Sequence, residues 1–103
     1  MATQVATILD LSHNNEDVDF GEAKAIGIIG VILKASQGRG FKDPTFLSRA
    51  ARVLEEGLAL AAYHFGDDSP AEEQVSNFQA AIQGAGIVPH VDERAFGLEE
   101  ARE

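Results

Sequence analysis

The stretch VATILDLSHNN (residues 5–15) is an apolar, β-branched run that turns abruptly polar at its end. This pattern predicts a buried strand over residues 5–12 followed by a loop. Similar runs recur at residues 28–34 (IIGVILK) and 58–65 (LALAAYHF), and a weaker fourth run lies at residues 87–92 (IVPHVD). The spacing of these runs leaves room for one helix between each pair of strands.

Amphipathic segments fill those gaps. Asp19, with a glutamate three residues later, predicts a capped helix through residue 25. Asp43 followed by proline predicts the start of a second helix. Ser69 followed by proline repeats that start signal for a third, and the sequence after residue 97 predicts the beginning of a fourth. The apolar stripes expected to face the core are Phe46, Leu47, Ala50, Val53 and Leu54 in the second helix and Val75, Phe78 and Ile82 in the third.

The resulting order is β-α-β-α-β-α-β-(α) in a single domain over residues 1–103. Strands that alternate with helices predict an α/β fold with a parallel sheet and right-handed crossovers. Residues 35–40 are expected to form a polar, glycine-rich loop after the second strand.

Composition and charge exclude several classes of protein. Eight basic and seventeen acidic residues give a net charge of −9, which argues against a nucleic-acid surface. The chain has no cysteine, so disulfides and thiolate nucleophiles are excluded. Its apolar runs are too short to span a membrane, and the N-terminus lacks the pattern of a secretory signal.

Polar side chains gather where the first three predicted strands end. They are Asp10, Ser12 and His13 on the first, Lys34, Ser36 and Gln37 on the second, and Tyr63 and His64 on the third. The carboxyl ends of parallel strands meet on one face, where α/β proteins build their sites. The sequence therefore predicts a functional site at this end of the sheet.

Asp10 is the most informative of these residues, because it lies between two leucines near the end of an apolar strand. An ionised carboxylate at such a position is costly unless it is paired or faces a cleft. Two interpretations remain open from the residues alone: a carboxylate of an active site, or one that caps a neighbouring loop.

Five motifs, in order along residues 5–82, resemble those of glycoside hydrolase family 25, the Chalaropsis-type lysozymes. The matching segments are ILDLSHN (8–14) with D-x-S-H, KASQG (34–38) with K-A-[ST]-[EQ]-G, FKDPTF (41–46) with aromatic-x-D-P-x-[FY], Gly57 with AAYHF (61–65), and EQVSNF (73–78) with [AE]-Q-A-x-x-F.

The resemblance implies an irregular (β/α) barrel that hydrolyses the β-1,4 bond between N-acetylmuramic acid and N-acetylglucosamine in peptidoglycan, without a metal or an organic cofactor. Asp10 matches the catalytic carboxylate of the first strand, and Tyr63 matches an aromatic hydroxyl that lines a sugar subsite. The residues expected to contact substrate are Ser12, His13, Lys34, Gln37, Tyr63, His64 and His90.

The fourth strand departs from the family pattern, in which a D-x-E motif supplies the general acid. Residues 87–94 read IVPHVDER and contain no such motif. The register that keeps apolar positions aligned places His90 at the aspartate and Asp92 at the glutamate, so Asp92 is the favoured acid. An aspartate is one methylene shorter, and proton transfer depends on reach. Glu93 is the alternative acid if the strand end is bulged.

The length is the second departure, because a complete (β/α)₈ barrel typically needs about 200 residues or more. This chain is expected to form about half of a TIM-like barrel, with two unpaired edges and an exposed apolar inner face. Such a face predicts either association into a homo-oligomer or disorder. The expected partner is bacterial peptidoglycan, reached by another export route or after cell lysis, and neither nucleic acid nor membrane is an expected partner.

The same residues allow other interpretations. A zinc site of Asp10 with the three histidines lacks the usual ligand spacing, and Gly38–Gly40 lacks a phosphate-binding fingerprint. His64 has a second interpretation, in which it orients a loop by hydrogen bonding. For the whole chain the alternatives are a non-catalytic glycan-binding relative, which would explain the missing D-x-E, and an open doubly wound domain with a non-sequential strand order.

Overall fold

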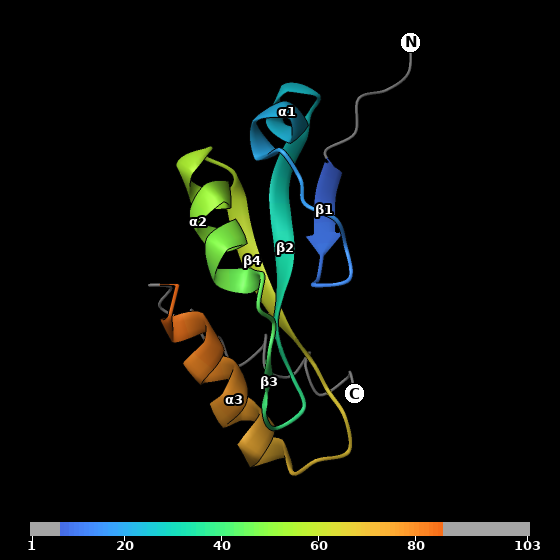
Figure 1. Ribbon diagram of the computed structural model, residues 1–103, viewed down its shortest axis with the longest axis vertical. Coiled ribbons are helices and arrows are strands. Elements are labelled where there is room, and N and C mark those ends of the chain that lie inside the picture. The colour runs from blue at the N-terminus through green and yellow to red at the C-terminus, as the bar shows by residue number, and fades with distance from the viewer. Residues whose placement is uncertain (1–6, 86–103) are drawn as a thin grey trace.

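The computed structural model describes residues 7–85, which form an α/β fold of one sheet and three helices (Figure 1). The strands are β1 (Thr7–Leu11), β2 (Ile28–Gln37), β3 (Phe41–Lys42) and β4 (Ala59–Phe65), and the helices are α1 (Phe20–Ala25), α2 (Phe46–Glu55) and α3 (Ala71–Gln83). The strand expected at residues 87–92, the helix expected after residue 97 and the predicted site residues His90, Asp92 and Glu93 lie outside the described range.

The three long strands are parallel and stand in sequential order, with β2 between β1 and β4. The sheet as a whole is mixed, because β3 pairs antiparallel with the end of β2. The prediction of a purely parallel sheet with a loop at residues 35–40 was therefore wrong. The chain continues as β2 to Gln37 and then turns back through Gly38, whose φ of 58° permits the tight return.

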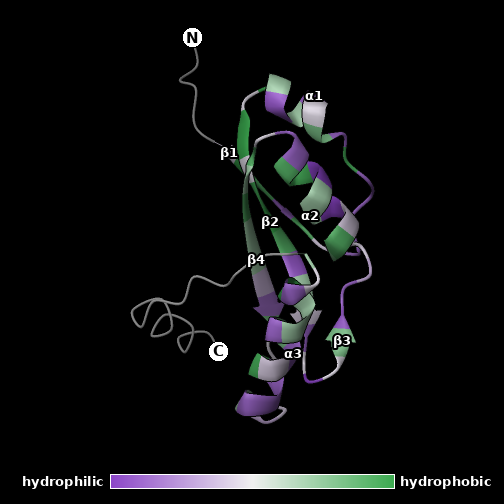
Figure 2. Ribbon diagram, turned by 90° about the vertical axis from the view of Figure 1, so that its left-hand side faces the viewer, coloured by the Kyte–Doolittle hydropathy of each residue, from purple (hydrophilic) through white to green (hydrophobic). Residues whose placement is uncertain are grey.

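All three helices contribute to one core against a single face of the sheet, called here the covered face. Leu11 of β1 stands beside Leu33 of β2, which stands beside Ala62 of β4. Leu11 and Leu33 pack with Phe20 of α1 and Phe46 of α2 in the core, and Ile82 of α3 belongs to the same cluster. Figure 2 shows α1 and α2 together on one side of the sheet.

The alternate residues of the same strands point to the opposite side, called here the open face, which no described helix covers. On this face Ile8 of β1 and Phe65 of β4 are 53% and 55% exposed, and Ala59 and Ala61 of β4 are exposed as well. An apolar sheet surface of this kind normally packs against further protein. Self-association through this face stays a prediction.

The predicted helix starts were right in one case and displaced in two. Asp19 caps α1 as expected, since its carboxylate accepts a hydrogen bond from the N–H of Glu22 at 3.0 Å. Helix α2 begins at Phe46, two residues after Pro44, and Asp43 caps the turn before it, since its carboxylate accepts the N–H of Thr45 at 2.8 Å. Helix α3 begins after Pro70, without a side-chain cap.

The buried stripes of α2 and α3 also differ from the predicted ones. Leu47, Leu54 and Val75 are between 44% and 53% exposed. Polar residues stand in the buried stripes instead, namely Arg49 in α2 and Gln74 and Asn77 in α3, each at most 8% exposed. None of the described helices is long and apolar enough to cross a membrane.

Candidate active site

The predicted site residues of β1, β2 and β4 meet at the carboxyl end of the sheet, and most of them lie on the open face. Asp10 is exposed there and stands beside Ile32 of β2, which stands beside Ala61 of β4. Two residues further along, Lys34 of β2 stands beside Tyr63 of β4. The open face thus gains polar side chains toward the carboxyl ends of the strands, where the exposed ring of Phe65 also lies.

The Tyr63 hydroxyl lies in the electrostatic field of two carboxylates. Burial raises the pKa of Tyr63 above its ordinary value, and the negative charges of Asp10 and Asp43 raise this pKa further. Tyr63 therefore keeps its proton at neutral pH and is available as a hydrogen-bond donor beside Asp10. Such a donor suits a sugar oxygen.

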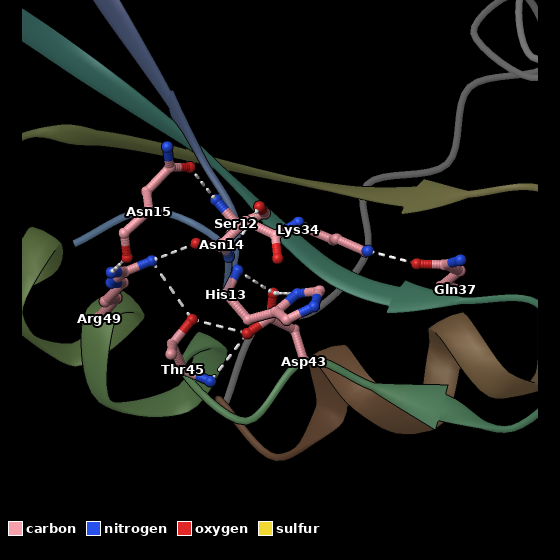
Figure 3. Close-up of polar contacts among 9 residues, drawn as sticks. All are labelled: Ser12, His13, Asn14, Asn15, Lys34, Gln37, Asp43, Thr45 and Arg49. Carbon is pink, nitrogen blue, oxygen red and sulfur yellow. Dashed lines mark hydrogen bonds and ion pairs between the residues drawn. The ribbon is translucent and has the colours of Figure 1, made fainter. Parts of the chain in front are cut away.

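Lys34 is a buried cation, only 4% exposed, held by neutral groups. Its ammonium donates a hydrogen bond to Oε1 of Gln37, as Figure 3 shows. The same nitrogen lies 5.3 Å from the ring centre of Phe41 and 5.2 Å from that of Phe65. Aromatic faces attract cations, so these two rings and the amide hold a positive charge at the rim of the open face.

His13 follows β1 and is fixed by Asp43, thirty residues away (Figure 3). Its backbone N–H donates to Oδ2 of Asp43 at 2.7 Å, and its ring Nδ1 lies 3.3 Å from the same oxygen. The side chain of Asp43 is fully buried, whereas that of His13 is 31% exposed. The ring also packs against Phe41, with 5.1 Å between ring centres, so His13 and Lys34 share an aromatic neighbour.

Asp43 is ionised although it is buried. Burial alone would raise the pKa of this carboxyl. The Thr45 hydroxyl and N–H, at 2.6 and 2.8 Å, and the contacts from His13 outweigh that effect and hold the pKa below its ordinary value. Asp43 is therefore a fixed negative charge with two functions: it anchors the loop after β1 through His13, and it caps the turn that leads into α2 through the N–H of Thr45, as its sequence context indicated.

Arg49 of α2 also holds the loop after β1. Its guanidinium donates to the carbonyl oxygens of Ser12 at 2.8 Å, Asn15 at 2.9 Å and Glu16 at 3.1 Å. Ser12 itself completes the turn, because its hydroxyl accepts the N–H of Asn14 at 3.2 Å. The loop that leaves the strand of Asp10 is thus held by a buried carboxylate and a buried guanidinium.

His64 lies on the covered face, away from Asp10. Its Nδ1 is 2.7 Å from the Ser36 hydroxyl, and its Nε2 is 2.9 Å from Oε1 of Gln74. The amide nitrogen of Gln74 donates to the carbonyls of Asp67 and Ser69, so its oxygen is the atom that accepts from Nε2 of His64. This geometry does not fit the expected sugar contact of His64 and matches its alternative role of orienting a loop.

The two described histidines are therefore engaged separately, His13 with Asp43 and His64 with Ser36 and Gln74. Within residues 7–85, no group of three or more histidine, aspartate or glutamate side chains is arranged to hold a metal ion.

Sequence reasoning missed four polar residues that shape the site: Asp43 as an anchor, Arg49, Gln74 and Asn77. Their spacing along the helices is the signal that could have identified them. Arg49 is one residue before Ala50 and three after Phe46, and Asn77 is three residues after Gln74, so each occupies a helix stripe that faces the sheet.

Comparison with known proteins supports the class that the fold and the site define. The model of the family described as Glycosyl hydrolases family 25 matches residues 9–92. This match covers most of the chain, which therefore belongs to glycosyl hydrolase family 25.

Individual relatives agree with this assignment. Lysozyme M1 of Streptomyces globisporus is 24% identical over 78 residues, which are 76% of this chain and 26% of that protein. The crystal structure of the CTP1L endolysin is 32% identical, with a TM-score of 0.73, over 82% of this chain and 32% of that one. The muramidase of Acremonium alcalophilum is 30% identical, with a TM-score of 0.67, over 70% and 36% respectively. The chain thus spans between about a quarter and just over a third of the length of these relatives.

Proposed function

We propose that this chain is part of a muramidase that cleaves the β-1,4 bond between N-acetylmuramic acid and N-acetylglucosamine in peptidoglycan. The observation that carries the proposal is the position of Asp10, an exposed carboxylate near the carboxyl end of the open face, where Tyr63 also lies. Glycoside hydrolysis needs one carboxylate to attack or stabilise the oxocarbenium-like centre and a second carboxyl group to protonate the leaving oxygen.

Asp10 takes the first of these roles in the proposal, and Asp92 takes the second, with Glu93 as its alternative. Tyr63 donates a hydrogen bond to the sugar, and Ser12, His13, Lys34 and Gln37 line the subsites around it. His64 acts only indirectly, by holding the loop between β4 and α3 through Gln74.

We further propose that the fold is part of a TIM-like barrel. The parallel strands β1, β2 and β4 stand in sequential order and keep their helices on one face, as in a (β/α) barrel. An open doubly wound sheet reverses its strand order at the site, so the sequential order favours the barrel. The open face would then be the inner wall of the barrel.

The test is the release of new reducing ends from purified peptidoglycan. The chain is compared with Asp10→Asn and with the matched control Asp68→Asn, which changes an exposed carboxylate of the loop after β4. We expect hydrolysis by the wild type and by Asp68→Asn, and none by Asp10→Asn.

The missing D-x-E motif favours one second candidate, a glycan-binding relative without catalysis. Co-sedimentation of the chain with peptidoglycan, without release of reducing ends, would support that candidate. A folded chain that neither binds nor cleaves peptidoglycan would contradict both.

A further inference from the structure

Asn77 is a buried amide in the middle of α3, only 4% exposed. It lies on the same stripe as Gln74, Ala81 and Ile82. The stripe is apolar toward the end of the helix, where Ala81 and Ile82 join the core, and polar toward its beginning. A buried amide is costly unless its hydrogen bonds are made, so its partners indicate what the residue does.

The partners of Asn77 lie on the hairpin formed by the end of β2 and β3. Its Nδ2 donates to the carbonyl oxygens of Gly38 and Phe41, both at 3.0 Å, and approaches that of Gln37 at 3.4 Å. Its Oδ1 accepts from the ammonium of Lys42 at 2.8 Å. Three acceptors on one side and a cation on the other fix the orientation of the amide.

Two residues of this hairpin are the ones that hold Lys34. Gln37 accepts the hydrogen bond of the Lys34 ammonium, and Phe41 presents its ring to the same nitrogen. Asn77 binds the backbone carbonyl of each. Asn77 of α3, some forty positions later in the sequence, therefore contacts the same two residues that contact the Lys34 ammonium.

The second ring at Lys34 is tied to the same hairpin. The N–H of Gly38 donates to the carbonyl of Phe65 at 3.0 Å, and Asn77 binds the carbonyl of Gly38. The groups around the Lys34 ammonium thus belong to one hydrogen-bonded unit.

We propose that Asn77 is a positioning residue of the candidate site, which holds the hairpin so that Gln37 and Phe41 enclose the Lys34 ammonium. An apolar residue would fill the same space, but it would leave the hairpin without these directional contacts, and satisfied polar networks specify one arrangement. The importance of Lys34 for substrate rests on the proposed function, whereas the geometric claim about Asn77 is independent of it.

The test uses nuclear magnetic resonance on the whole chain labelled with ¹³C-lysine. The face of an aromatic ring shifts the resonances of nearby nuclei, so the ε-methylene of Lys34 reports on Phe41 and Phe65 without requiring any activity. Phe41→Leu removes one ring and gives the signal expected for a lost contact. Asn77→Ser and Asn77→Asp remove the donors, and Ser76→Ala is the control at an exposed position of the same helix.

We expect the Lys34 signal in both Asn77 variants to move toward its position in Phe41→Leu, and to stay unchanged in Ser76→Ala. A wild-type Lys34 signal in a folded Asn77 variant would overturn the proposal. Loss of folding in both Asn77 variants would also overturn it, because Asn77 would then be required for the fold as a whole. Absence of peptidoglycan hydrolysis by the wild type would bear only on the proposed function.

Discussion

The two faces of the sheet are built from the same three strands and differ in what they do. On the covered face, Leu11, Leu33 and their neighbours pack against three helices and are almost inaccessible to water. On the open face, Ile8 and Phe65 are more than half exposed, and Asp10, Lys34 and Tyr63 gather at the carboxyl end. Stability therefore resides on one side of β1, β2 and β4 and the candidate chemistry on the other.

The largest predicted effect is the difference in the free energy of unfolding between one substitution on the covered face and one on the open face. Phe46 is 2% exposed and Phe65 is 55% exposed. Phe46→Ala should lower the free energy of unfolding by about 3–5 kcal/mol, because it leaves a cavity in the core. Phe65→Ala should cost about 1 kcal/mol or less. Chemical denaturation measures both, and equal losses would contradict the division between the faces.

A smaller effect concerns the loop between β1 and α1, which Asp43 anchors. The pKa of Asp43 is lowered in the folded protein, so its contribution to stability is present above about pH 4, the ordinary value for aspartate. That contribution is lost as the pH falls through the folded-state pKa. Asp43→Asn should lower the free energy of unfolding by about 1–3 kcal/mol at neutral pH.

The pH dependence is the sharper part of this prediction. The stabilities of Asp43→Asn and of the wild type, measured by denaturation between neutral and acidic pH, should converge as the pH falls. Asp68→Asn serves as the control at an exposed carboxylate. A difference that persists unchanged at low pH would show that the ionised form of Asp43 is not what anchors the loop.

The smallest effect separates two glycines of one hairpin. Gly38 has a φ of 58°, and a Cβ added there would lie 2.4 Å from Oδ2 of Asp67, whereas a Cβ at Gly40 meets nothing within 4 Å. Gly38→Ala should cost about 1–2 kcal/mol from the left-handed backbone alone, and Gly40→Ala should be nearly neutral. Thermal unfolding of the two variants checks this, and equal melting temperatures would show that the turn does not constrain the hairpin.

The strands and the place of the site were predictable from the sequence, because both depend on local pattern. Apolar runs separated by capped helices gave β1, β2 and β4, and the rule that parallel strands end on one face brought Asp10, Lys34 and Tyr63 together. The resemblance of the motifs to family 25 was confirmed by the match of the family model to residues 9–92.

The polar anchors were not predictable in this way, because their partners are distant in sequence. Arg49 binds carbonyls more than thirty residues earlier, and Asn77 binds a hairpin at a similar separation. The Asp43-Pro44 pair has the local form of a helix start, and Asp43 does cap the turn before α2, but its bond to His13, thirty residues earlier, leaves no local signal. His64 was placed among the sugar contacts because the strand ends there. It alternates with Tyr63 along β4 and therefore lies on the covered face. The one-residue irregularity in β2 between Lys34 and Ser36 brings Ser36 beside it.

The most direct test of the account is a titration of the ¹⁵N-labelled chain with soluble peptidoglycan fragments, followed by nuclear magnetic resonance. The account predicts that amide signals at the carboxyl end of the open face, from Asp10, Lys34 and Tyr63, shift together as fragments are added. Signals from the acidic groove of Asp17, Glu55 and Glu56 beside Arg52, on the helix side, should stay unchanged. Shifts confined to that groove, or none at any concentration, would contradict the claim that the open face carries the site.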